Sequence, residues 1–505
     1  MDSGGRGDAG LKALAICSDR FAPVAIAPRM RNRYTPVHVA HEIREVRLAA
    51  TPRDPEAEMT IQGRRVAGGE ESRPIRLEAG RNVLSLEVTA ADRRTKSCYH
   101  PAVFRDHPTV AWKKVLDAAP WAARDSAGEL VFDGRMWLLG GYTPGVVKDI
   151  WCSGDGQSWS HVGELSASKG GIDIPLAFAY SGRMWVADRD GLLFSSADGS
   201  GWSLVTDQAP WRGRGAAGGT VFRDRMWVMG GVSEGRFLND VWCSEDGVRW
   251  TQELEHAPWS PRTLHNTPLV LDGRMWLIGG AAAGDYHPFR SYRDVWCSPD
   301  GRSWERVTDE APWPGRQWGS TIVYRDRLWL LGGFRPEPVW QNFGDVWYSS
   351  DGEHWHELDC PATCRHSGSG GVPVAVSSSI WAPRHEMSVY ALHGQLWVVG
   401  GNVWPLMNDV WCLDIPGLTF VTQPVLEEFV GTRYEYRSRA DFHASRGALG
   451  YRLLDSPGWL RVDPETGRIE GRAPAAGDVR VTVEARDAAG ETARQSYTLH
   501  ILPAS

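Results

Sequence analysis

Six segments of the chain repeat one pattern of apolar and polar residues. Each has an apolar stretch, a short polar turn and a second apolar stretch built around Arg-Met-Trp or a close variant, usually ending in Gly-Gly. Short apolar stretches separated by polar turns are typical of paired β-strands. The six segments are VFDGRMWLLGG (131–141), FAYSGRMWVAD (178–188), VFRDRMWVMGG (221–231), VLDGRMWLIGG (270–280), VYRDRLWLLGG (323–333) and YALHGQLWVVGG (390–401).

A third and a fourth strand are expected after most of these pairs. The third contains Asp-Val-Trp or Asp-Ile-Trp in five copies, whereas the second copy has the weaker GLLFS (191–195). The fourth follows an Asp-Gly turn and carries another Trp, as in DGRSWERV. The Trp residues of the second strand, from Trp137 to Trp397, lie 48, 42, 49, 53 and 68 residues apart. Four short strands at a period of about 50 residues predict a β-propeller blade.

The six predicted blades must close into a ring, because one four-stranded sheet cannot bury both of its faces alone. The last unit ends in DVWCLDIPGLTF without the Asp-Gly turn and Trp of a fourth strand. A lone copy of that strand, WKKVLDAAPW (112–121), precedes the first unit and matches WERVTDEAPW (304–313) closely. We therefore expect an all-β fold with a six-bladed propeller over residues 110–415, in which 112–121 completes the sixth blade.

The Gly-Gly pairs, the DVW strands and the DG..W turns resemble kelch repeats, in the variety found in the central domain of galactose oxidase and in many bacterial kelch proteins. The resemblance covers about 300 residues and six copies. It implies the propeller fold. It does not imply one function, since kelch propellers serve binding, scaffolding and several chemistries.

Two further β-sandwich domains are expected beside the propeller, after a disordered stretch at residues 1–10. Residues 11–106, with IQGRRV, LEAGRN, LEVTAAD and Tyr99, resemble the cadherin-like β-sandwich family. Residues 416–505, with GTRYEYRSRA and GWLRVDPETGRIEGRAP, resemble the putative Ig, or dystroglycan-type cadherin-like, module. Neither resemblance implies an enzyme, and the two domains are expected to act as spacers or as contacts for a protein partner. Calcium at Asp441, Asp455 and Asp487 is not favoured, because an Asp-rich pattern is missing after Ala440.

Composition narrows the function classes. The 505 residues carry a formal net charge of −7 and no basic block, which argues against binding to nucleic acid. No apolar run approaches the roughly 18 residues that span a bilayer. Tryptophan is unusually frequent, with 26 residues, and the repeat accounts for most of them as core. The eight Cys do not form a disulfide framework and no leader is evident, so we expect a cytoplasmic protein, or an exported one if a leader precedes this sequence.

One face of the predicted propeller carries all the long loops, and long loops on a rigid scaffold commonly hold function. An arginine precedes the innermost strand on that face in five blades, whereas the second blade has SKGGIDIP instead. Guanidinium groups bind oxyanions with two parallel hydrogen bonds, so these arginines predict an anionic small molecule, glycan or peptide as partner. The alternative is that they brace the blades by bonding to loop carbonyls. The five are Arg124, Arg214, Arg262, Arg316 and Arg384.

Aromatic and titratable residues accompany the arginines. Trp318, Tyr286, His287, Trp340 and Trp404 are expected to supply apolar surfaces for a sugar or peptide, unless they only pack the loops. His265, His385 and Glu386 are the candidates for proton transfer if the site is catalytic. Asp125, Asn266 and Gln317 lie at neighbouring positions of the innermost strands.

A separate cluster, Cys360, Cys364 and His366, lies in the longest loop of that face. Cys-x₃-Cys-x-His could hold one copper, iron or zinc ion with His385 or His265 as fourth ligand, or the cysteines could form a loop disulfide or do neither. Galactose oxidase uses copper with a cross-linked Tyr-Cys pair and two His, and that constellation has no counterpart here residue by residue.

Three functions remain open on the sequence. The first is a recognition propeller that binds an anionic glycan, peptide or metabolite on its long-loop face. The second is an enzyme on the same face, either an acidic-sugar mutarotase or epimerase or a metal-dependent oxidase similar to galactose oxidase. The third is a structural interaction scaffold, with protein partners held through the β-sandwich domains.

Overall fold

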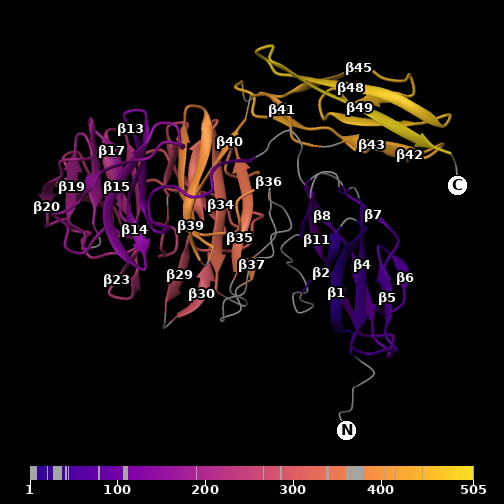
Figure 1. Cartoon of the computed structure of the whole chain (residues 1–505), viewed down its shortest axis with the longest axis horizontal. Coiled ribbons are helices and arrows are strands. Elements are labelled where there is room, and N and C mark those ends of the chain that lie inside the picture. The colour runs from indigo at the N-terminus through magenta and orange to yellow at the C-terminus, as the bar shows by residue number, and fades with distance from the viewer. Residues whose placement is uncertain are drawn as a thin grey trace, which may run out of the picture. The chain divides into compact units, whose positions relative to one another are not determined.

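The computed structural model describes residues 8–19, 21–26, 37–39, 43, 45–77, 80–105, 112–188, 190–265, 267–284, 287–336, 341–359, 364–365, 380–403, 405–415, 417–422, 424–445 and 447–503. These residues form strands and connecting turns, with no helix among them (Figure 1). The chain folds into two compact units, one of residues 112–357 and 363–414 and the other of residues 1–111, 358–362 and 415–505. Among the described residues, no helix has the length and apolar character needed to cross a membrane.

The unit that contains the repeats holds six antiparallel sheets. In each sheet four strands are hydrogen-bonded in sequence, so that the second strand lies between the first and the third. The first three sheets are β13 (Gly128–Phe132), β14 (Arg135–Thr143), β15 (Gly145–Ser153) and β16 (Ser160–Glu164); β17 (Ala177–Tyr180), β18 (Arg183–Ala187), β19 (Leu193–Ser196) and β20 (Ser203–Thr206); and β21 (Gly218–Phe222), β22 (Arg225–Met229), β25 (Val241–Ser244) and β26 (Thr251–Leu254).

The other three sheets repeat this order. They are β27 (Leu269–Leu271), β28 (Arg274–Ile278), β31 (Val295–Ser298) and β32 (Glu305–Thr308); β33 (Ser320–Tyr324), β34 (Arg327–Arg335), β35 (Gln341–Ser349) and β36 (His356–Asp359); and β38 (Ser388–Leu392), β39 (Gln395–Asn402), β40 (Leu406–Asp414) and β12 (Trp112–Leu116). In the last sheet β12 pairs with β40 in antiparallel register, so a strand that precedes the first repeat is the fourth strand of the sixth sheet.

Short additional strands extend three of the repeats. They are β23 (Val232–Ser233) with β24 (Arg236–Phe237), β29 (Ala281–Gly284) with β30 (His287–Ser291), and β37 (Cys364–Arg365), which pairs with β35.

The first strands of the six sheets follow one another in a cycle. Strand β13 lies against β17, β17 against β21, β21 against β27, β27 against β33, β33 against β38, and β38 against β13. Apolar residues of neighbouring sheets form shared clusters, such as Trp137 and Leu139 with Met184 and Val186. The second-strand tryptophans of the repeat, from Trp137 to Trp397, are all buried and are therefore core residues.

The N-terminal β-sandwich has three sheets with one apolar core. Its strands are β1 (Leu11–Ser18), β2 (Phe21–Ala25), β3 (Val37–Val39), β4 (Glu45–Pro52), β5 (Glu58–Ile61), β6 (Arg64–Val66), β7 (Ile75–Arg76), β8 (Gly80–Val83), β9 (Leu86–Thr89), β10 (Lys96–Tyr99) and β11 (Ala102–Arg105). Alternation of buried and exposed side chains is clear in β4, which presents Val46, Leu48 and Ala50 to the core. Ala9 also packs into this core, so the domain includes residues that precede position 11.

The C-terminal β-sandwich is built in the same way. Its strands are β41 (Thr419–Phe420), β42 (Glu427–Phe429), β43 (Arg433–Arg437), β44 (Ala440–Asp441), β45 (Gly450–Asp455), β46 (Leu460–Val462), β47 (Arg468–Arg472), β48 (Gly477–Arg486) and β49 (Thr492–Leu502). Tyr434, Tyr436 and Tyr497 are central core residues, and the hydroxyl groups of Tyr434 and Tyr497 share a hydrogen bond of 3.0 Å. A buried hydroxyl needs such a partner.

Candidate functional site

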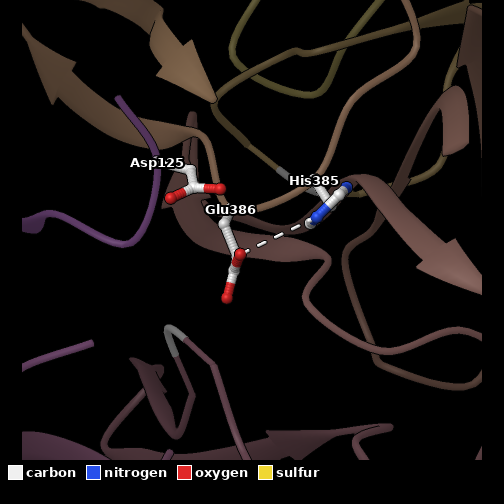
Figure 2. Close-up of side chains that lie close together, drawn as sticks. All are labelled: Asp125, His385 and Glu386. Carbon is white, nitrogen blue, oxygen red and sulfur yellow. Dashed lines mark ion pairs between the residues drawn. The ribbon is translucent and has the colours of Figure 1, made fainter. Parts of the chain in front are cut away.

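Three buried side chains from the two ends of the repeat region meet at one point. Asp125 precedes β13, while His385 and Glu386 precede β38, and these two strands are neighbours. One ligand atom from each of the three side chains lies within 4.8 Å of the other two (Figure 2). Among the described residues this is the one group of three or more His, Cys, Asp or Glu side chains close enough to hold a metal ion. We refer to Asp125, His385 and Glu386 as the DHE cluster.

The orientation of His385 follows from its neighbours. Its ring stacks on Trp318, with centroids 5.4 Å apart and an interplanar angle of 23°. Nδ1 of His385 lies 2.7 Å from Oδ1 of Asn342, and Nδ2 of Asn342 donates to the carbonyl of Asn402 at 2.9 Å. Because that second bond uses the amide nitrogen, the oxygen of Asn342 must accept from His385. Nδ1 therefore carries a hydrogen, and in the neutral ring the lone pair is on Nε2.

The surroundings of the two carboxyl groups of the cluster, on Asp125 and Glu386, disfavour their ionised form. Burial raises the pKa of Asp125, against the hydrogen bonds it receives from Asn402 and Ser126. Burial also raises the pKa of Glu386 well above its usual value, and the nearby carboxylates of Asp125 and Asp173 raise it further. Nε2 of His385 lies 3.8 Å from Oε2 of Glu386, as the dashed line in Figure 2 marks. Two neighbouring buried carboxyl groups call for a shared proton or a cation.

The backbone at this point is strained. Glu386 has φ of 49° and Trp318 has φ of 54°, both in the left-handed region that residues other than glycine rarely adopt. The amide of Glu386 donates to the carbonyl of Trp318 at 3.1 Å, which ties the last two repeats together at the cluster. The equivalent residues of two other repeats, Ser126 and Ala216, also have positive φ, of 56° and 47°, so this conformation belongs to the repeat and is not confined to the cluster. Strain of about 1 kcal/mol or more per residue persists only where surrounding contacts impose it.

A cavity of about 390 Å³ lies between the first strands of the repeats. Its walls are mostly apolar, with Phe178, Leu264 and Val389 among them, and its polar lining includes Glu129 and His265. Burial lowers the pKa of His265 to about 4, so its ring is neutral near pH 7. Its Nδ1 is buried and has no hydrogen-bond partner among the described residues. None of the five arginines that precede the first strands belongs to the described lining of this cavity.

Each of those five arginines forms an ion pair inside its own sheet. In the fifth sheet, Arg316 donates through Nη1 and Nη2 to the two oxygens of Asp345 at 2.5 and 2.6 Å, and to the carbonyl of Gly332 at 2.7 Å. Trp347 completes the arrangement by donating to Asp345 at 2.7 Å. The same contacts recur for Arg124 with Asp149, Arg214 with Asp240, Arg262 with Asp294 and Arg384 with Asp409.

These contacts correspond to the bracing role. The main partner is an aspartate in the third strand or directly before it, in addition to a loop carbonyl. At Asp409 burial opposes ionisation, but the Arg384 guanidinium outweighs it, and the pKa of Asp409 is lowered. The second sheet has no such arginine, and there Ser168 donates to the buried Asp188 at 2.7 Å. The guanidinium groups thus serve an internal purpose in five sheets.

The remaining predicted residues divide into three groups. His265, His385, Glu386 and Trp318 are described, and the structure brings His385, Glu386 and Trp318 together while His265 lines the cavity. His287 begins β30 and Cys364 begins β37, with nothing further described of their side chains. Tyr286, Trp340, Trp404, Asn266, Cys360 and His366 lie outside the described residues, so the Cys360–Cys364–His366 metal site stays a prediction. Asp441, Asp455 and Asp487 do not form a ligand group among the described residues.

Sequence reasoning missed two parts of this region. The partners of the arginines could have been found, because the Asp of the DVW or DIW strand occurs in the five repeats that have the arginine and is missing with it from the second. The amides that orient the cluster, Asn342 and Asn402, carry no such signal, since neither belongs to the shared repeat pattern.

Comparisons with known proteins identify the two flanking domains. Residues 17–105 match the family model of the cadherin-like beta sandwich domain, and residues 421–502 match that of the putative Ig domain. Both predictions for the flanking domains are confirmed. The chain is thus all-β, with a cadherin-like and an Ig-like domain.

Part of the chain is similar to three curated proteins at low identity. Alpha-scruin and Beta-scruin of Limulus polyphemus are 26% and 25% identical over 221 and 209 residues, which are 40% of this chain in each case and 22% and 20% of the scruins. The Leucine-zipper-like transcriptional regulator 1 homolog of Drosophila melanogaster is 28% identical over 138 residues, or 24% of this chain and 13% of that protein. The matches therefore span about a fifth or less of these relatives. The scruins are kelch-repeat proteins, which agrees weakly with the kelch resemblance.

Proposed function

We propose that this protein is an interaction scaffold, in which a kelch-type propeller carries a cadherin-like and an Ig-like β-sandwich that hold protein partners. The observation that carries the proposal is the internal pairing of the five arginines. A receptor for an anionic ligand needs guanidinium groups that face the ligand, whereas Arg124, Arg262 and Arg384 are nearly inaccessible and bound to aspartates. The flanking domains are of types whose usual role is contact between proteins.

The finer architecture in this proposal is a six-bladed propeller closed by β12. Two features support it: the cyclic order of the six first strands, and the pairing of β12 with β40 across almost the whole repeat region. Shared apolar clusters between consecutive sheets supply the burial that radial stacking of blades requires. A ring of this kind is rigid, which suits a platform for other proteins.

The Ig-like domain offers a defined surface for a partner. Phe429 of the edge strand β42 lies opposite Leu502 of β49, and both side chains are exposed, by 43% and 37%. An exposed apolar pair at the edge of a sheet is suited to extension of that sheet by a strand from another protein. We include this pair in the proposed interaction surface.

The proposed location is the cytoplasm. Six cysteines, Cys17, Cys98, Cys152, Cys243, Cys297 and Cys412, are free thiols, and free thiols are the usual state in a reducing compartment.

Reciprocal binding tests the scaffold. A polypeptide partner captured on the purified full chain should bind again when both components are pure, and Phe429→Asp should weaken that binding at least about tenfold. Leu204→Asp, on an exposed residue of β20 in the repeat region, is the matched control and should leave binding unchanged. Binding of acidic sugars or acidic peptides at micromolar concentration, lost on substitution of a bracing arginine by Met in a folded variant, would instead support the recognition hypothesis.

A further inference from the structure

We infer that the DHE cluster is a binding site for one divalent transition-metal ion, with Zn²⁺ as the best match. Asp125, His385 and Glu386 offer two carboxylates and one imidazole. Zn²⁺ and the neighbouring first-row transition metals bind both imidazole nitrogen and carboxylate oxygen. Harder ions such as Ca²⁺ prefer oxygen ligands alone, so the imidazole favours a transition metal. Its three ligands are not members of the predicted Cys360–Cys364–His366 cluster, and the site adds a function to the proposed scaffold.

The spacing of the ligand atoms suits a single ion. Two ligand atoms that each lie about 2.1 Å from one ion can be at most about 4.2 Å apart. Nε2 of His385 and Oε2 of Glu386 are 3.8 Å apart, and all three ligand atoms are within 4.8 Å of one another. Small rotations of the side chains would therefore bring all three ligand atoms to one ion.

The surroundings of His385 are those of a metal ligand. Metal-binding histidines commonly donate the hydrogen of the other ring nitrogen to an oxygen acceptor, which fixes the ring and exposes the ligating lone pair. His385 does this through Nδ1 to Oδ1 of Asn342 at 2.7 Å, and the amide of Asn342 is itself held by the carbonyl of Asn402. The lone pair is thereby on Nε2, the nitrogen nearer to Glu386.

A buried amide gives a second, independent indication. Asn402 is 4% exposed and reaches into the cluster, where its Nδ2 donates to Oδ2 of Asp125 at 2.7 Å. Its Oδ1 is buried without a hydrogen-bond partner among the described residues. An unsatisfied buried carbonyl oxygen is costly, and a cation beside it would satisfy it.

The arginines nearest in sequence do not compete for the two carboxylates. Arg124 and Arg384, which directly precede Asp125 and His385, are bound to Asp149 and Asp409. Asp173 adds further negative potential at Glu386. Negative charge concentrated in a buried site attracts a divalent cation, which would balance the two carboxylates without a large rearrangement.

Metal binding by the purified full chain tests the inference. After removal of metals with a chelator, equilibrium dialysis against Zn²⁺ should load one ion into the DHE cluster, and Zn²⁺ should raise the melting temperature. Glu386→Gln, which keeps shape and removes charge, should weaken this binding at least about tenfold. Glu129→Gln, the same change on the adjoining strand β13, is the matched control and should bind Zn²⁺ as the wild type does. Asp125→Asn is a second isosteric variant, so the test stands if one of them fails to fold.

Three outcomes would overturn the inference: no Zn²⁺ bound at micromolar concentration, binding unchanged in folded Glu386→Gln and Asp125→Asn, or binding lost in Cys364→Ser but kept in Glu386→Gln. Co²⁺ adds a spectroscopic reading in the same samples. Ligation by the DHE cluster should give visible d–d bands that persist in Cys364→Ser, whereas a strong thiolate-to-cobalt charge-transfer band as the sole signal would assign the ion to the cysteines.

Discussion

At the residue scale, one position in the repeat explains more of the chemistry than any other. The arginine that precedes the first strand binds the aspartate of the DVW or DIW motif, 29 residues later in the case of Arg316 and Asp345. Both side chains are almost fully buried, at 4% and 3% exposure. A buried ion pair of this kind adds little stability over an apolar pair, but the loss of one partner leaves the other charged and buried.

Removal of that arginine should therefore destabilise the repeat region strongly. We expect Arg316→Met to lower the free energy of unfolding by about 3–5 kcal/mol, because Asp345 would remain buried without its partner. Urea denaturation followed by tryptophan fluorescence measures this. The double variant Arg316→Met with Asp345→Asn should recover part of the loss.

The control for that experiment is Arg249→Gln. Arg249 pairs with Asp246 across a turn but is 91% exposed. Its loss should leave the unfolding midpoint unchanged within error, and an equal effect of the two arginine variants would contradict the bracing role.

His265 should make the stability of the repeat region depend on pH. Burial lowers its pKa to about 4, below the 6.5 of an unperturbed histidine. Between these pH values the imidazole is protonated in the unfolded chain but not in the folded chain. The contribution of His265 to the free energy of unfolding is therefore fully present above about pH 6.5 and falls as the pH drops toward 4. From pH 7 to pH 5 the loss from this group should be about 2 kcal/mol.

Denaturant unfolding of the wild type and of His265→Gln at pH 7 and pH 5 tests this. The difference between the two pH values should be smaller by that amount in the variant, which has no imidazole to protonate. Equal pH dependence in both proteins would show that His265 is not the titrating group.

At the scale of elements, the Asp-Gly turn both connects the third strand to the fourth and packs against the neighbouring sheet. Its glycine adopts positive φ, as in Gly301 at 80°, and it also lies under the Trp of the preceding sheet. A Cβ added at Gly301 would lie 2.3 Å from Cζ3 of Trp227. The same close approach occurs for Gly156 with Trp397, Gly199 with Trp137, Gly247 with Trp185 and Gly352 with Trp276. The turn and the Trp anchor, which recur together in sequence, thus pack against each other between neighbouring sheets.

We expect Gly301→Ala to be much more harmful than alanine in an open turn. Gly273, with φ of 68° and no atom within 4 Å of an added Cβ, is the matched control. The control should lose about 1 kcal/mol from backbone strain alone, whereas Gly301→Ala should lose about 3 kcal/mol because the Trp227 ring must also move. Chemical denaturation of the two variants measures the difference, and equal losses would contradict the packing role of the turn.

At the scale of the whole molecule, the pairing of β12 with β40 joins the start of the repeat region to its end. Lys113 lies opposite Cys412 in this pair, about 300 residues away along the chain. In the unfolded chain that separation carries a large loop entropy, which a covalent link between the two strands would remove.

Lys113→Cys should therefore form a disulfide with Cys412 under oxidising conditions and stabilise the protein by about 2–5 kcal/mol. Thermal unfolding with and without reductant measures the gain. Lys114→Cys is the control, because Lys114 lies opposite Trp411 and its side chain points to the other face of the strand. A disulfide in Lys113→Cys that forms fully but adds no stability would argue against closure of the ring by β12.

Much of the architecture is accessible from sequence because it is encoded locally. Strand alternation, turns that need positive φ and the repeated Trp are short-range features, so the strands of each repeat can be placed by residue range and the two flanking domains recognised. His385 and Glu386 can be selected because they differ from their counterparts in the other repeats.

What the sequence alone determined was the all-β character, the repeat and the two β-sandwiches. Only the tertiary structure decided what the chemistry-bearing side chains touch. Asp125 and Glu386 are 261 residues apart, and they meet because the first and last repeats lie side by side. The arginines suggest ligand contacts by their repeated position, whereas in the fold each is bound to an aspartate of its own sheet. Periodicity describes the neighbours of a residue along a strand, whereas contacts between sheets depend on how the sheets are arranged in space, which no local pattern encodes.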